Sequence, residues 1–91
     1  MDNGIMVGQI VKSKSGRDKD RYFLVSKVLP KERTVFLVDG EKRFLENPKK
    51  KNLLHIQMTK TVAKELAEKI QKGSESCDQE IKRYLKELQV D

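Results

Sequence analysis

The chain has few of the residues from which active sites and metal centres are built. It holds one histidine, His55, and one cysteine, Cys77, so it offers neither a histidine pair nor the usual ligands of a zinc site. Tryptophan is absent and aromatic residues make up 5% of the chain, which leaves little material for a deep apolar pocket. Gly16 is followed by neither Gly-Lys-Ser nor a second spaced glycine, so no phosphate-binding glycine loop is present. We therefore expect no enzymatic activity and no bound metal or cofactor.

Long apolar runs are also missing. No stretch approaches the roughly 18 residues needed to span a membrane. Residues 1–4 have neither the basic start nor the apolar stretch of a secretion signal. A single cysteine cannot form an intramolecular disulfide and is typical of a reducing compartment. These features predict a cytoplasmic protein without a membrane partner.

The positive charge is unevenly distributed. The chain of 91 residues has a net charge of +6. Residues 1–56 hold thirteen lysines and arginines against seven acids, whereas residues 57–91 hold seven of each. The whole positive excess therefore belongs to the first segment, which is the electrostatic pattern of a protein that binds a polyanion. A net positive charge alone is also explained by solubility. The confinement of the excess charge to residues 1–56 is therefore stronger evidence for polyanion binding than the net charge itself.

Short segments rich in β-branched and aromatic residues predict strands in the first half. Residues 6–13, 21–29 and 34–38 are such segments, and the second has apolar side chains on both faces. A polar loop with Gly16 separates the first two. Asp39-Gly40 is a two-residue hairpin signal, which predicts a return strand over residues 42–46.

A basic loop over residues 47–52 then leads to a short apolar segment at residues 53–56. Five short strands with tight turns favour a small barrel, closed or nearly so, over a sandwich.

From Thr59 onward the apolar spacing changes to a helical period, with Val62, Leu66 and Ile70 on one stripe. Gly73 is expected to end this helix. Ser76, with Gln79 three residues later, predicts the start of a second helix. Its apolar stripe is Ile81, Tyr84, Leu85 and Leu88. We therefore predict an α+β fold, with a five-stranded barrel over residues 1–58 and a helix pair over residues 59–91.

The basic residues of the first segment fall into groups that a small barrel can bring together. Loops at one end and an adjoining face can place them against one phosphate backbone, where each neutralised phosphate releases counterions. Aromatic rings stack on unpaired bases wherever they are exposed. The candidate rings are Tyr22, Phe23 and Phe44. The candidate cations are Lys12, Lys14, Arg17, Lys19, Arg21, Lys42, Arg43, Lys49, Lys50 and Lys51.

The segment Gly8-Gln-Ile-Val-Lys-Ser-Lys-Ser-Gly-Arg-Asp-Lys19, followed by an apolar strand, resembles the KOW motif. Ribosomal proteins share this motif with transcription elongation factors of the NusG type. The continuation at residues 35–40, 42–43 and 47–55 is similar to the large-subunit ribosomal protein fourteen of the eukaryotic and archaeal type. Small bacterial KOW proteins that resemble that protein are closer still.

This resemblance covers roughly residues 5–58 and implies an SH3-like barrel that contacts RNA, usually ribosomal RNA, through the Gly16 loop and nearby basic strands. Asp20 stands where many KOW motifs have a second glycine, and residues 59–91 have no counterpart. The resemblance assigns RNA contact to Lys12, Lys14, Gly16, Arg17, Lys19, Lys42, Arg43 and Lys49–Lys51.

Two functions stay open on this basis. The first is RNA binding in translation, on the ribosome or on ribosomal RNA, with ribosomal or translation proteins as further partners. The second is a protein-interaction module, because SH3-like barrels and NusG-type domains also bind proteins. In that case the amphipathic helices dock on an acidic protein or form a dimer. Phosphate contacts alone do not distinguish RNA from DNA, and the sequence leaves the oligomeric state undetermined.

Overall fold

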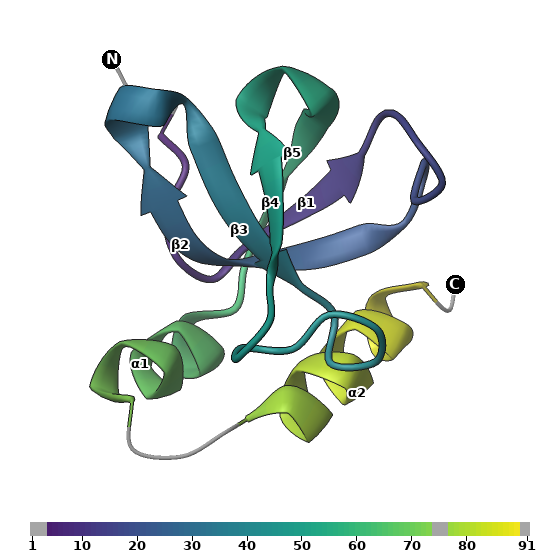
Figure 1. The fold of residues 1–91 in the computed structure, drawn as a ribbon. Coiled ribbons are helices and arrows are strands. Elements are labelled where there is room, and N and C mark those ends of the chain that lie inside the picture. The colour runs from purple at the N-terminus through teal and green to yellow at the C-terminus, as the bar shows by residue number, and fades with distance from the viewer. Residues whose placement is uncertain (1–3, 74–76, 90–91) are drawn as a thin grey trace.

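The computed structural model describes residues 4–73 and 77–89. Five strands come first and two helices follow them, which confirms the predicted α+β class (Figure 1). The strands are β1 (Gln9–Ser13), β2 (Tyr22–Leu29), β3 (Thr34–Val38), β4 (Lys49–Asn52) and β5 (Ile56–Val62). The helices are α1 (Lys64–Lys72) and α2 (Asp78–Gln89). Single turns of 3-10 helix, η1 (Pro30–Glu32) and η2 (Leu53–His55), precede β3 and β5.

The strands form one antiparallel sheet in the order β4-β3-β2-β1-β5. β4 and β5 are therefore the two edges, although only η2 separates them along the chain. Within residues 4–73 and 77–89 no ladder of hydrogen bonds joins these edges, so the sheet is open.

The alternation of side chains along the strands divides the core between the two faces of the sheet. One cluster is built around Val11, Phe23 and Leu37, and the other packs the opposite face of the sheet against the helices. β2 contributes to both, since Phe23 and Leu24 are buried on opposite faces. The apolar side chains that the sequence places on both faces of this segment are therefore both covered. Each such side chain contributes roughly 1.5–3 kcal/mol of transfer free energy on burial.

The two helices lie together on one side of the sheet (Figure 1). Leu66, Ile81 and Leu85 are buried against the sheet, which confirms the predicted apolar stripes except for Val62, a residue of β5. Gly73 ends α1 in the left-handed conformation, as predicted. Lys69 Nζ, on α1, donates to both carboxylate oxygens of Glu80 on α2 at 2.7 Å. The predicted capping box at Ser76 lies outside the described residues.

The predicted hairpin at Asp39-Gly40 and the return strand over residues 42–46 are wrong. A ten-residue loop, residues 39–48, follows β3, and its extended pairing is limited to one bridge between Phe44 and Asn47. The partner of β3 is β4, whose lysines were assigned to a loop. Edge strands rich in lysine are common because the charges prevent pairing with other chains. The lysine-rich composition of β4 therefore predicted a loop, although the segment is a strand.

Two further boundaries differ from the predictions. The first strand begins at Gln9 because Val7 and Gly8 form a turn, with a φ of +92° at Gly8. A side chain at Gly8 would meet the Ala67 Cβ of α1 at 2.7 Å, so this turn lets the helix approach. The helix predicted from Thr59 begins at Lys64. Residues 59–62 belong to β5, and the predicted division between residues 58 and 59 therefore falls inside a strand.

Candidate nucleic-acid interface

The loop between β3 and β4, residues 39–48, is organised by the carboxylate of Asp39. Its Oδ1 accepts hydrogen bonds from the amides of Glu41, Lys42 and Arg43 at 2.9, 2.8 and 2.8 Å. The amides of Asp39 and Gly40 donate in turn to the Arg43 carbonyl at 3.0 and 2.9 Å. Asp39 is 7% exposed. The backbone that carries the Lys42 and Arg43 side chains is therefore fixed.

The loop between β1 and β2, residues 14–21, is a compact turn. The Lys19 amide donates to the Gly16 carbonyl at 3.2 Å, and the Arg21 amide donates to the Asp18 carbonyl at 2.9 Å. Gly16 has a φ of +80° and Asp20 has a φ of +71°. Both lie in the left-handed region that favours glycine. Position 20 therefore has a backbone conformation that glycine adopts more readily than aspartate.

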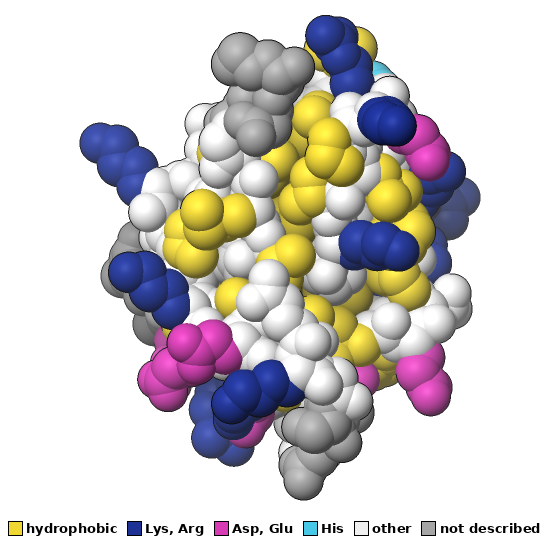
Figure 2. Space-filling view, turned by 90° about the vertical axis from the view of Figure 1, so that its left-hand side faces the viewer, with side chains coloured by type: hydrophobic (Ala, Val, Ile, Leu, Met, Phe, Trp, Pro, Cys, Tyr) yellow, Lys and Arg dark blue, Asp and Glu magenta, His cyan; other side chains and the backbone are white. Residues whose placement is uncertain are grey.

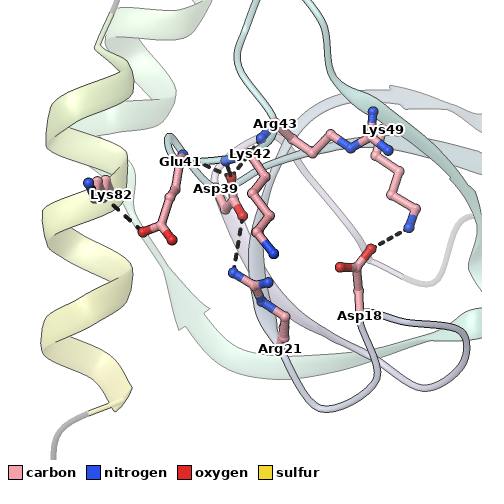
Figure 3. Close-up of polar contacts among 8 residues, drawn as sticks. All are labelled: Asp18, Arg21, Asp39, Glu41, Lys42, Arg43, Lys49 and Lys82. Atoms are coloured by element: carbon pink, nitrogen blue, oxygen red, sulfur yellow. Dashed lines mark hydrogen bonds and ion pairs between the residues drawn. The ribbon is translucent and has the colours of Figure 1, made fainter.

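Two ion pairs tie these loops to each other and to β4 (Figure 3). An Arg21 guanidinium nitrogen lies 3.6 Å from an Asp39 carboxylate oxygen. Lys49 Nζ donates to the Asp18 carboxylate, and this hydrogen bond holds the Asp18 pKa below its ordinary value. Both loops therefore lie at the same end of the sheet.

The three consecutive lysines of β4 divide between the two faces of the sheet. Lys49 and Lys51 are paired with Leu37 and Val35 of β3, whereas Lys50 is paired with Phe36 and points to the opposite face. Lys51 Nζ donates to the Ser15 carbonyl at 3.3 Å and so lies beside the Gly16 loop. Lys50 Nζ instead lies 3.1 Å from a Glu32 carboxylate oxygen. Among the described residues, Lys51 is the lysine of this strand that forms no ion pair, so it adds positive charge to the loop end.

The predicted contact residues thus separate into two sets. Arg21, Lys49 and Lys50 are each neutralised by an acid, and Lys12 lies over the Tyr22 ring at 5.6 Å from its centroid. The others belong to the two loops or to β4 and, within residues 4–73 and 77–89, form no ion pair. We call this set the loop surface: Lys14, Arg17, Lys19, Lys42, Arg43 and Lys51, together with the exposed Gly16 of the first loop.

Figure 2 shows the side on the left of Figure 1, whereas the loop between β1 and β2 lies on the right in Figure 1. On the side seen in Figure 2, hydrophobic side chains occupy much of the middle, and basic side chains are scattered around and among them.

Sequence reasoning missed Asp18 and Asp39, the two acids that position the loops. The role of Asp39 was predictable from its local sequence, because an aspartate in a turn readily accepts hydrogen bonds from amides two or more residues further along the chain. Among the candidate rings, Phe23 is 2% exposed and so does not meet the exposure that stacking requires. Tyr22 is half-buried beneath Lys12, whereas Phe44 is 40% exposed.

The histidine and the cysteine differ in their position relative to the loop surface: the Lys14 amide donates to the His55 carbonyl at 2.8 Å, whereas Cys77 belongs to the core between the sheet and the helices. Cys77 is buried just before α2, and burial raises the pKa of its thiol. His55 is an exposed residue of η2. Among residues 4–73 and 77–89 no three His, Cys, Asp or Glu side chains form a group that could hold a metal ion. In the same ranges neither helix is long and apolar enough to cross a membrane.

No family model matches the chain. No curated protein matches it either.

Proposed function

We propose that the protein binds RNA through the loop surface. The observation that carries the proposal is a set of six cations that form no ion pair among the described residues and that lie on two loops and one strand joined by the Arg21–Asp39 and Lys49–Asp18 pairs. Arg21 and Lys49, whose charges are neutralised, hold these loops together. A phosphate backbone that crosses the loop surface would meet cations on fixed backbone, which reduces the entropy lost on binding.

The domain is proposed to be a KOW-type, SH3-like barrel in an open form. The strand order supports this, as does the placement of the two edge strands on either side of η2. Further support comes from the positive φ angles of Gly16 and Asp20 in the motif loop. The choice of ribosomal RNA or the ribosome as target, and a role in translation, rest on the resemblance of residues 8–55 to the KOW proteins.

Crosslinking in cells, followed by sequencing of the bound RNA, tests the target. We expect enrichment of ribosomal RNA fragments, and we expect this enrichment to fall when Arg17 and Lys51 are both changed to Glu. Recovery of scattered messenger fragments would replace the ribosomal assignment with general RNA binding. Recovery of no RNA above the background of an uncrosslinked sample would contradict the proposal.

A protein-interaction module is the second candidate, and a groove between the helices favours it. The groove has a volume of about 490 Å³ and lies between α1 and α2, with Val62, Leu66 and Tyr84 among its lining residues. Affinity capture before and after ribonuclease treatment separates the two candidates. Glu65 and Lys69 also line the groove, and both can be changed to Ala. Protein partners that persist after ribonuclease treatment, and that this double variant no longer captures, would favour the protein-binding function.

A further inference from the structure

Phe44 is the aromatic side chain that the fold leaves open to solvent. It is 40% exposed, whereas Phe23 is 2% exposed. Lysine ammonium groups lie over Tyr22 and Phe36, at 5.6 and 5.8 Å from the ring centroids. The ring of Tyr84 packs against the core between the sheet and the helices. Phe44 alone among the five aromatic residues is thus both exposed and without a lysine over its face.

The backbone on both sides of Phe44 is fixed. The Arg43 amide is bound by Asp39, and the Leu45 amide donates to Asp78 Oδ1 at 3.0 Å. The Asn47 amide donates to the Phe44 carbonyl at 2.8 Å. Leu45 packs against the core, whereas the neighbouring Phe44 is exposed. A ring held in this way loses little conformational freedom when it meets a ligand.

Two cations of the loop surface immediately precede the ring. Lys42 and Arg43 have no acidic partner among the described residues, and both belong to the loop that carries Phe44. An exposed aromatic ring beside cations is the combination that binds single-stranded nucleic acid, because bases stack on the ring while the cations track the backbone. A base inside a duplex is already stacked on both faces and cannot use such a ring.

We propose that Phe44 stacks on an unpaired base of the bound RNA, while Lys42 and Arg43 contact the adjoining phosphates. The site therefore takes single-stranded segments, loops or bulges in preference to continuous duplex. This inference rests on the proposed RNA-binding function and specifies the kind of RNA that the loop surface accepts.

The absence of tryptophan from the chain makes a direct test possible. Phe44→Trp introduces a single indole whose fluorescence is quenched when a base stacks on it. Met6→Trp is the matched control, because Met6 is 52% exposed and lies in the segment before β1 rather than in either loop. The probes are a single-stranded RNA oligonucleotide, the same oligonucleotide in a duplex, and an abasic version of equal charge.

We expect the single strand to quench Phe44→Trp but not Met6→Trp, and the abasic strand to quench neither. In anisotropy titrations Phe44→Ala should bind the single strand roughly 5- to 100-fold more weakly and the duplex unchanged. RNA binding without quenching, together with unchanged affinity in Phe44→Ala, would overturn the inference and leave the proposed function standing. Failure of the unaltered protein to bind either RNA would overturn both. Circular dichroism of each variant establishes that it is folded.

Discussion

The guanidinium of Arg21 lies 3.6 Å from the carboxylate of Asp39, and this contact joins the two loops of the loop surface. The side chain of Asp39 is 8% exposed and that of Arg21 is 36% exposed, so the pair lies partly beneath the surface. Asp39 uses one oxygen for Arg21 and the other for three amides of its own loop. One carboxylate therefore organises residues 39–43 and fixes their position relative to the loop between β1 and β2.

Asp39→Ala tests this organising role. The change leaves three amides without their acceptor and Arg21 without its partner, so we expect the free energy of unfolding to fall by about 2–3 kcal/mol. Asp39→Asn keeps an oxygen that accepts from the amides, and its loss should be smaller. Urea denaturation followed by circular dichroism measures both. Equal stability of Asp39→Ala and the unaltered protein would refute the role.

Gly40→Ala tests the packing of the same loop on α2. An added Cβ at Gly40 would lie 2.1 Å from the Asp78 carbonyl oxygen and 2.8 Å from the Lys82 amide nitrogen. We expect a loss of about 2–4 kcal/mol, which combines this overlap with the left-handed backbone at Gly40. Gly73→Ala is the control, because it has the same backbone strain and nothing within 4 Å. Its loss should be about 1 kcal/mol, and similar thermal unfolding of the two variants would contradict the predicted overlap.

The Asp18–Lys49 pair predicts a pH dependence of stability. The pKa of Asp18 in the folded protein lies below its ordinary value of 3.8, chiefly because of the hydrogen bond from Lys49. The pair therefore stabilises the fold fully above that value, and its contribution disappears as the pH falls through the folded pKa. We expect Asp18→Asn to be about 0.5–1 kcal/mol less stable at neutral pH. This difference should vanish in strong acid, and a difference that persists there in urea titrations would rule out the ion pair as its cause.

The division of the β4 lysines predicts unequal effects on RNA binding. Lys51 lies beside the Gly16 loop, whereas Lys50 is on the opposite face with Glu32. Lys51→Glu should weaken binding roughly 5- to 20-fold, because it replaces an attraction to phosphate with a repulsion. Lys50→Glu changes the net charge equally and should weaken binding less than about twofold, since screening reduces the effect of a distant exposed charge. Equal losses in anisotropy titrations would show that only total charge matters.

Elements were predictable from the sequence where the conformational preference of their residues matches the structure that they adopt in the fold. β3 matches its predicted bounds, because an unbroken β-branched and aromatic run has no competing structure. Gly73 ended its helix as expected for a residue that readily adopts positive φ. In β5, Thr59 and Thr61 carried the β-branched signal of a strand, but the helical spacing that starts at Val62 obscured it.

The remaining features depend on contacts distant in sequence. Asp39-Gly40 has the composition of a tight hairpin turn, yet Gly40 packs on α2, and Asp39 binds Arg21, eighteen positions earlier in the chain. The three lysines of β4 look like a solvated charge run until pairing with β3 divides them between two faces. The list of basic residues was therefore accessible from the sequence, whereas their separation into neutralised and available cations required the fold.

The most direct test of the central claim is the salt dependence of RNA affinity. Fluorescence anisotropy of a labelled ribosomal RNA fragment, titrated with the intact protein at several salt concentrations, gives the slope of log K against log salt. Binding through the loop surface, with about four to six phosphates neutralised, predicts a slope near −3 to −5. The double variant Arg17→Glu, Lys51→Glu should give a slope shallower by about 2. A flat salt response of the unaltered protein, or an unchanged slope in the double variant, would contradict the account.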